Sequence, residues 1–197
     1  MDMVKVIIDG VQVEVPKDST ILDAARIAGI DIPTLCYLKG INAIGACRIC
    51  LVEVEGARAL QASCVYPVSD GLVVHTNTPV VREARRINLE LILSNHDRKC
   101  LTCVRNQKCE LQDLAERFHI KDIRYEGERI DYARDELSPS IVRDANKCVL
   151  CRRCVAVCAS QGVSAIGPVE RGFRTIVAPA FDMSINDVPC INCGQCI

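Results

Sequence analysis

The chain has 197 residues, a formal net charge of −1, 14 cysteines and no tryptophan. This charge balance argues against binding to nucleic acid or to an acidic membrane surface. The sequence shows no signal peptide and no apolar run near the roughly 20 residues that span a bilayer, so we expect a soluble, cytoplasmic protein without membrane contact. In that reducing compartment, cysteines in CxxC spacing indicate metal binding rather than disulfides.

Residues 1–78 are predicted to form a small α+β domain. Alternating apolar residues on either side of the turn dipeptide Asp9-Gly10 indicate a β-hairpin. A helix follows, because Thr20 and Asp23 fit a capping box ahead of an apolar helical face.

The loop after this helix begins the first of four cysteine sets. Its spacing, C-x10-C-x2-C-x13-C, is close to the plant-type 2Fe-2S run, although the first gap is longer. Gly45 and Ala46 are small enough for backbone N–H groups to approach a cluster there. The predicted ligands are Cys36, Cys47, Cys50 and Cys64.

Residues 79–119 are predicted to form a helical module. Thr78 suits the N-cap and Pro79 the first position of a helix over residues 79–95. Its apolar face is predicted from the helical spacing of Val80, Ala84, Ile87 and Leu91.

A histidine and three cysteines follow this helix with the spacing H-x3-C-x2-C-x5-C. This donor set suits either structural zinc or an iron–sulfur cluster, and the other cysteine sets in the chain favour iron. A neutral imidazole in place of an anionic thiolate would raise the reduction potential of such a cluster, as in Rieske centres. The predicted ligands are His96, Cys100, Cys103 and Cys109.

Residues 120–140 are charge-rich and weakly periodic, so we expect a connector with solvated charges and room for short strands. His75 and His119 lie outside any cluster spacing. We therefore assign these two histidines to surface or packing roles.

Residues 141–197 carry the run C-x2-C-x2-C-x3-C, which is typical of bacterial two-cluster ferredoxins. In such runs the first three cysteines hold one 4Fe-4S cluster and the fourth crosses over to complete the other. The long spacer from Ala159 to Pro189 predicts an inserted hairpin, and Ala159 stands where proline is usual. The two predicted ligand sets are Cys148, Cys151 and Cys154, and Cys158 with Cys190, Cys193 and Cys196.

The set with three cysteines needs a fourth ligand. By the same spacing rule we expect that ligand just past Ile197, about four residues after Cys196. The two-cluster module is therefore expected to be truncated at its C-terminal end, with one 4Fe-4S cluster lacking its fourth protein ligand.

Taken in order, four segments resemble the iron–sulfur region of the catalytic subunit of multisubunit, electron-bifurcating, NAD(P)-linked FeFe hydrogenases. These segments are "KCLTCVRNQKCELQDLA", "CVLCRRCVAVC", "RGFRTIVAPAF" and "CINCGQCI". The resemblance implies a β-grasp 2Fe-2S ferredoxin domain, a small His-ligated 4Fe-4S module and a two-cluster 4Fe-4S ferredoxin-like module. It implies electron transfer between an H-cluster domain, absent from these residues, and flavin- and iron–sulfur-containing subunits that use NAD(P) and ferredoxin. The parent protein is then an oxidoreductase, while these 197 residues hold no catalytic residue.

Four alternatives stay open at this point. The first two modules also resemble the large peripheral-arm subunit of respiratory complex I, although we expect that subunit to lack the ferredoxin run. The catalytic subunit of NAD-dependent molybdenum or tungsten formate dehydrogenase can carry the same module order. A free-standing electron carrier and a zinc-binding interaction scaffold are the other two.

Overall fold

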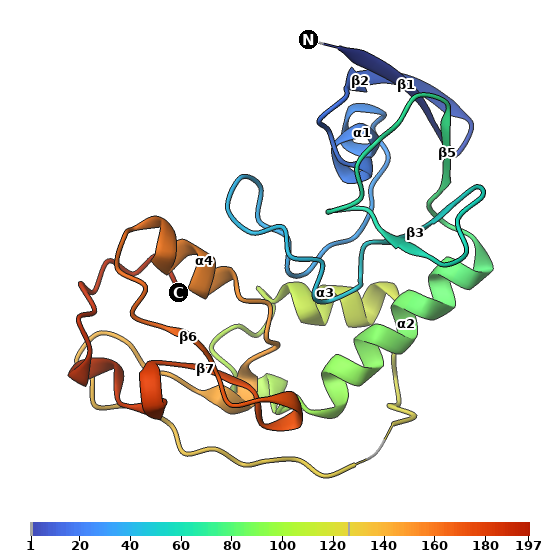
Figure 1. Cartoon of the computed structure of the whole chain (residues 1–197). Helices are drawn as coiled ribbons and strands as arrows, with labels where there is room; N and C mark the ends of the chain where they lie inside the picture. The colour runs from blue at the N-terminus through green and yellow to red at the C-terminus, as the bar shows by residue number, and fades with distance from the viewer. Residues whose placement is uncertain (1, 126) are drawn as a thin grey trace.

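The computed structural model describes residues 2–125 and 127–197, so Met1 and, within the connector, Glu126 lie outside the described residues. The predicted α+β class is confirmed. Figure 1 shows a sheet with helix α1 at the N-terminal end of the molecule, and helix α4 with a two-stranded sheet at the other end. Helices α2 and α3 lie between these two parts.

The N-terminal domain is built on a five-stranded sheet with the strand order β2-β1-β5-β3-β4. β1 pairs with β5 in parallel, whereas the other pairings are antiparallel. The strands are β1 (Met3–Ile8), β2 (Val11–Pro16), β3 (Leu51–Val54), β4 (Gln61–Ala62) and β5 (Leu72–His75).

The predicted hairpin is confirmed in β1 and β2. Ile8 pairs with Val11, and between them Asp9 and Gly10 have φ angles of 48° and 84°. Two positive φ angles are what a tight two-residue hairpin turn requires, which explains the Asp-Gly dipeptide.

Helix α1 (Ile21–Ile27) begins with the predicted capping box. The Thr20 side chain accepts from the backbone N–H of Asp23, and the Asp23 carboxylate accepts from the backbone N–H of Thr20. The helix buries Leu22 and Ala25 in the core of this domain. Because that core lies beside the cysteine loops, it fixes their position.

Helix α2 (Pro79–Ser94) has the predicted start and length, with Thr78 as its N-cap. The predicted apolar face is wrong. Val80 is 62% exposed and Leu91 is 48% exposed, and none of the four predicted positions belongs to the buried face. The buried face consists of Val81, Arg85, Leu89, Glu90 and Leu93. A hydropathy pattern does not assign charged residues such as Arg85 and Glu90 to a buried face. Both side chains can be buried here because both have hydrogen-bond partners.

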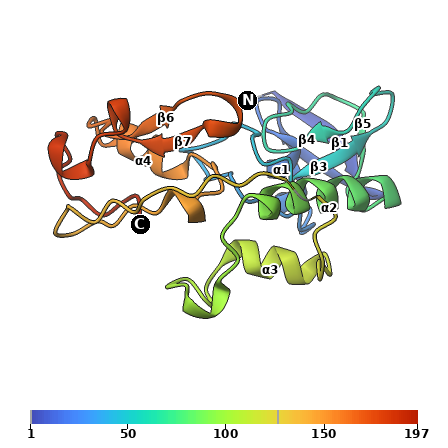
Figure 2. The ribbon, with the colours of Figure 1, turned by 90° about the horizontal axis from the view of Figure 1, so that it is seen from below.

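Helix α3 (Glu110–Arg117) packs against α2 through a second hydrophobic core. Seen from below, α2 runs along the sheet and α3 lies beyond it (Figure 2). Leu35 and Ile49, from the N-terminal domain, pack into the same core as Leu89 and Leu111. The first two predicted modules therefore share a core.

Asp135 of the connector forms an isolated bridge with Arg143 of the C-terminal module, and the described residues of the connector contain no named strand. The expectation that its charges are simply solvated is wrong at Arg124. That guanidinium bonds to Glu90, which is 0% exposed, with Nε and Oε2 2.8 Å apart. The connector is therefore tied to α2 by an ion pair.

The C-terminal module contains α4 (Arg153–Ser160) and the strands β6 (Gly167–Val169) and β7 (Ile176–Ala178). β6 and β7 pair antiparallel, which confirms the predicted inserted hairpin. Within residues 2–125 and 127–197, no helix combines the length and hydrophobicity needed to cross a bilayer.

Candidate iron–sulfur sites

The four cysteines of the first set converge next to the core of the N-terminal domain. Cys36, Cys50 and Cys64 are each 1% exposed, and Cys47 is half-buried. The Sγ atoms of Cys50 and Cys64 lie 3.4 Å apart. Buried, unpaired cysteines gathered in this way are a suitable donor set for a 2Fe-2S cluster.

These cysteines associate as two pairs. A hydrogen bond from the Cys36 thiol lowers the pKa of Cys47 to about 6 and raises the pKa of Cys36. In the same way, a hydrogen bond from Cys64 lowers the pKa of Cys50 to about 6 and raises that of Cys64. One sulfur of each pair therefore favours the thiolate form, which is the form that binds metal.

Backbone donors surround the first pair, as the small residues before Cys47 predict. The backbone N–H of Ala46 acts to lower the pKa of Cys36, and the backbone N–H of Ile49 contributes to the lowered pKa of Cys47. Gly45 has a φ of 61°, and a Cβ atom there would meet Val65 at 3.3 Å. A side chain is therefore disfavoured at this position on two grounds.

The second set lines one cavity of about 100 Å³ between α2 and α3. His96 follows the C-cap of α2, Cys100 starts a 3-10 turn, and Cys103 ends that turn. Cys109 is the N-cap of α3. The loop between the two helices thus brings all four predicted ligands to one place.

His96 is suited to bind a metal in this cavity. Burial, and then the charge of Lys147, lower its pKa and keep the imidazole neutral. Its Nδ1 atom is buried and has no hydrogen-bond partner among the described residues. A neutral ring with an unpartnered nitrogen is the form that metals bind.

The fourth set surrounds a small cavity in the C-terminal module. Cys158 lies on α4, whereas the other three cysteines lie near the end of the chain. All four line this cavity of about 20 Å³: Cys158, Cys190, Cys193 and Cys196. Cys158 therefore lies beside the three C-terminal cysteines, apart from them in sequence but lining the same cavity.

The third set lies at the start of α4. Burial, and then the charges of Cys148 and Cys151, raise the pKa of Cys154 to about 11, which reflects the nearness of these three sulfurs. A weaker contribution from Cys196 shows that the third and fourth sets are neighbours.

Asn42 connects the first and third sets. It is 3% exposed, and its side-chain amide donates to the carbonyl oxygens of Cys36 and Cys151 at 2.7 and 3.0 Å. Nothing in the cysteine spacing indicates this residue, because one of its two partners is 109 residues away.

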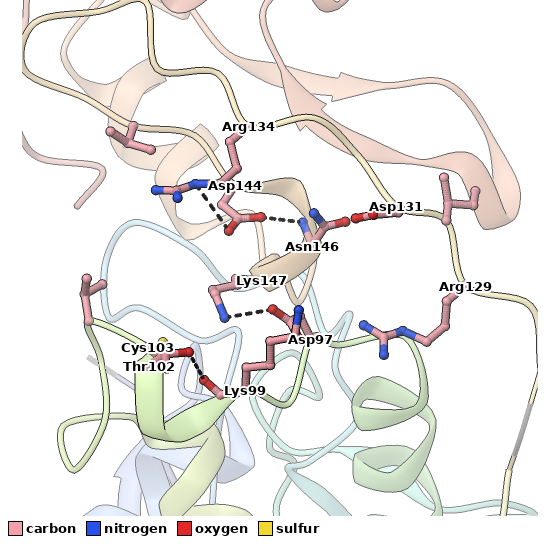
Figure 3. Close-up of a pocket in the computed structure, with 13 residues that line it drawn as sticks. Asp97, Lys99, Thr102, Cys103, Arg129, Asp131, Arg134, Asp144, Asn146 and Lys147 are labelled. Atoms are coloured by element: carbon pink, nitrogen blue, oxygen red, sulfur yellow. Dashed lines mark hydrogen bonds and ion pairs between the residues drawn. The ribbon is translucent and has the colours of Figure 1, made fainter.

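A further cavity, of about 870 Å³, lies between the second set and the connector (Figure 3). Its charges are largely paired: Lys147 bonds to Asp97 at 3.1 Å, and Arg134 lies 3.8 Å from Asp144. Of the predicted cluster ligands in the described residues, it touches Cys103 alone. We therefore assign the cluster chemistry to the four sets and not to this cavity.

Within the described part of the chain, no three His, Cys, Asp or Glu side chains gather closely enough to hold a single metal ion. His75, which pairs with Glu55 at 3.0 Å on the surface, and the exposed His119 lie outside the four sets, as predicted.

Two protein families match parts of the chain. Residues 1–79 match the 2Fe-2S iron-sulfur cluster binding domain, and residues 85–124 match the NADH-ubiquinone oxidoreductase-G iron-sulfur binding region. The first match contains the first cysteine set, and the second contains His96 and its three cysteines.

Similar proteins are oxidoreductase subunits. The NADP-reducing hydrogenase subunit HndD of Solidesulfovibrio fructosivorans is 50% identical over 203 residues, which cover 100% of this chain and 35% of that subunit. A G-type subunit of the NADH-quinone oxidoreductase of Rhizobium meliloti (strain 1021) is 41% identical, over 99% of this chain and 23% of that subunit. A crystal structure of an NAD+-reducing NiFe-hydrogenase in the H2-reduced state matches with a TM-score of 0.89 at 27% identity, covering 95% of this chain and 80% of the other.

The match to the Rhizobium meliloti protein corrects one expectation. The ferredoxin run was expected to separate this chain from subunits of the complex I type. Because the match covers 99% of the chain, it includes the C-terminal module. That module therefore does not distinguish a hydrogenase subunit from a G-type subunit. The chain spans about a third or less of the length of these two relatives.

Proposed function

We propose that the chain conducts electrons within the catalytic subunit of an FeFe hydrogenase. The premise is that it is an iron–sulfur region of the kind found in G-type subunits of NADH dehydrogenases and in related hydrogenase subunits. The observation that carries this choice is the 50% identity with the NADP-reducing hydrogenase subunit, which extends over the whole chain. A cytoplasmic location is part of the proposal, because the 14 unpaired cysteines need a reducing compartment.

The four sets would hold one 2Fe-2S cluster and three 4Fe-4S clusters. The clusters supply one-electron transfer, in which no covalent bond is made or broken. The protein's part is to hold each cluster, bury it and set its potential by ligand charge and hydrogen bonding. The first set would bind the 2Fe-2S cluster, the His96 set one 4Fe-4S cluster, and the two sets of residues 141–197 the others.

Within the parent enzyme these residues would carry electrons between an H-cluster domain and partner subunits that contain flavin and further iron–sulfur centres. Through those subunits the enzyme would use NAD(P) and ferredoxin, and it would bifurcate electrons between them. The proposed domain limits are 1–78, 79–119 with the connector 120–140, and 141–197.

A G-type subunit of an NADH-quinone oxidoreductase is the second candidate, because the 41% identity with the Rhizobium meliloti protein also extends over nearly the whole chain. The two functions differ in both redox partners: the hydrogenase exchanges electrons between H2 and NAD(P), whereas the second candidate passes them from NADH to a quinone. A formate dehydrogenase would differ from both by its molybdenum or tungsten.

The test uses the full-length parent protein with its native partner subunits, purified without oxygen. We expect iron and acid-labile sulfide without molybdenum or tungsten, and H2-dependent reduction of a viologen dye and of NAD(P)+. Quinone reduction by NADH without H2 oxidation would favour the second candidate and overturn the first. A colourless protein that contains zinc alone would overturn both.

A further inference from the structure

Ser63 is a buried residue of the first site to which the proposed electron transfer assigns no role. It follows β4, directly precedes Cys64 and is 0% exposed. Its backbone is fully engaged: its N–H donates to the carbonyl of Cys50 at 3.1 Å, and its carbonyl accepts from the N–H of Leu22 at 3.0 Å. These two bonds fix residue 63 beside residue 50.

The Ser63 hydroxyl, in contrast, is unsatisfied. Its Oγ atom is buried and makes no hydrogen bond of acceptable geometry within the described residues. Folded proteins rarely leave a buried hydroxyl unpaired, because burial removes its bonds to water without replacement. An acceptor that belongs to the bound state of the site would explain this exception.

The surroundings of the hydroxyl indicate which acceptor this is. The backbone N–H of Ser63 donates to the carbonyl oxygen of Cys50 at 3.1 Å, and Ser63 directly precedes Cys64 in the chain. The hydroxyl therefore belongs to a residue that is held between two predicted ligands of the first site. Cys64, 3.4 Å from Cys50 between their Sγ atoms, belongs to the same end of the site.

We propose that the Ser63 hydroxyl donates a hydrogen bond to a sulfur at the Cys50–Cys64 end of the 2Fe-2S cluster and thereby raises the reduction potential of that cluster. Reduction adds one electron and therefore one negative charge. A donor bonded to sulfur stabilises the more negative state more strongly, and hydrogen bonds to the sulfurs are among the factors that set cluster potentials. The proposal rests on the proposed assignment of the first set as the 2Fe-2S ligands.

Ser63 differs from the donors at the other end of the site in a way that makes the proposal testable. At the Cys36–Cys47 end, the donors include the backbone N–H groups of Ala46 and Ile49, which substitution does not remove. The Ser63 donor is a side-chain group on a residue that is not itself a predicted ligand. It can therefore be removed while all four cysteines stay in place.

The experiment is a redox titration of Ser63→Ala in the full-length protein, followed by the electron paramagnetic resonance signal of the 2Fe-2S cluster. We expect the equilibrium constant for reduction to fall about tenfold, which for one electron is a shift of about 59 mV to lower potential. The other clusters should keep their potentials. Ser63→Thr retains the hydroxyl and should stay near the wild-type value.

Ser138→Ala is the matched control, because Ser138 is also buried, at 8% exposure, but lies in the connector. It should shift none of the potentials. If Ser63→Ala loses the cluster, Ser63→Thr and Ser63→Val provide the same comparison, since they have nearly the same shape and differ in the hydroxyl.

An intact 2Fe-2S signal with an unchanged potential in Ser63→Ala, or equal potentials in the Thr and Val variants, would overturn the proposal while leaving the proposed function standing. A wild-type protein without any 2Fe-2S signal would instead overturn the ligand assignment on which both depend.

Discussion

The side-chain amide of Asn42 donates to the carbonyl oxygen of Cys151 at 3.0 Å, although the two residues are 109 positions apart in the sequence. The same amide donates to the carbonyl oxygen of Cys36 at 2.7 Å. One buried side chain therefore holds the ligand loop of the first site against that of the third. The connection between the Cys36 loop and the Cys151 loop therefore consists of one side-chain amide and two hydrogen bonds.

Replacing Asn42 with leucine should loosen this junction. Leucine has a similar size but donates no hydrogen bond, so two carbonyl groups lose their partner. We expect a loss of about 1–3 kcal/mol in the free energy of unfolding, measured by denaturant titration. We also expect slower reoxidation of the first cluster through the third.

Asn88→Leu is the control for this substitution. The Asn88 amide donates to the carbonyl of Ala84, one turn earlier in the same helix. That bond joins no two parts of the fold, so the control should change the unfolding free energy by less than about 0.5 kcal/mol. Equal losses in the two variants would contradict the bridging role of Asn42.

Glu90 should be the most sensitive charged residue of α2. It is 0% exposed and accepts from Arg86 and Arg124, at 2.9 and 2.8 Å. Glu90→Gln keeps the shape but removes the charge, and should cost about 1.5–3 kcal/mol, the range for hydrogen bonds to charged groups. Glu83→Gln, which affects an exposed partner of the same Arg124, should cost less than about 1 kcal/mol.

The pH dependence of the unfolding free energy tests the interaction of Glu90 with Arg124 and Arg86. Hydrogen bonds from Arg124 and then Arg86 lower the pKa of Glu90 in the folded state. The unfolded state therefore binds more protons, and stability rises with pH in this range. The contribution of Glu90 should be complete above the unfolded value of about 4.3 and disappear as the pH falls through the lower folded pKa. Glu90→Gln should flatten this part of the unfolding curve, and an unchanged curve would contradict the assignment.

These residues show which parts of the structure follow from local sequence. The hairpin turn at Asp9-Gly10 and the capping box of Thr20 and Asp23 depend on residues at most three positions apart, so local patterns suffice. The partners of Arg85 and Glu90 outside α2 are 34 positions away. Hydropathy alone therefore selects a different face of α2 from the one that is buried.

The cysteine sets are predictable for a different reason. Ligand spacing is imposed by the cluster itself, so the spacing alone is enough to match Cys158 with the distant Cys190. Residues that support the ligands are under no such spacing rule. Asn42 and Ser63 carry no sequence signal: only the fold shows that the Asn42 amide bonds to Cys151 and that the Ser63 hydroxyl is buried without a partner among the described residues.

His96 provides a test of ligand charge at the second site. His96→Cys would replace a neutral imidazole with an anionic thiolate, which makes the cluster more negative and harder to reduce. We expect its reduction potential to fall by on the order of 100 mV, measured by the same spectroscopic titration. His119→Cys, at an exposed position outside the four sets, should leave this potential unchanged. A rise in potential for His96→Cys would exclude the histidine as a ligand.

Cys158 tests the crossover between the third and fourth sites. It lies on α4, four positions after Cys154, but lines the cavity of Cys190, Cys193 and Cys196. If it binds the fourth cluster, Cys158→Ala should convert that cluster to a 3Fe-4S form or remove it, and the cluster of Cys154 should remain.

Three further variants decide the outcome of that test. Cys193→Ala should damage the same cluster as Cys158→Ala, so the two spectra should lose the same 4Fe-4S signal. Ala159→Pro restores the residue usual after the fourth cysteine of a ferredoxin run and should leave both clusters intact. If Cys158→Ala instead reproduced the spectrum of Cys151→Ala, Cys158 would belong to the third site, and the run would bind one cluster with its own four cysteines.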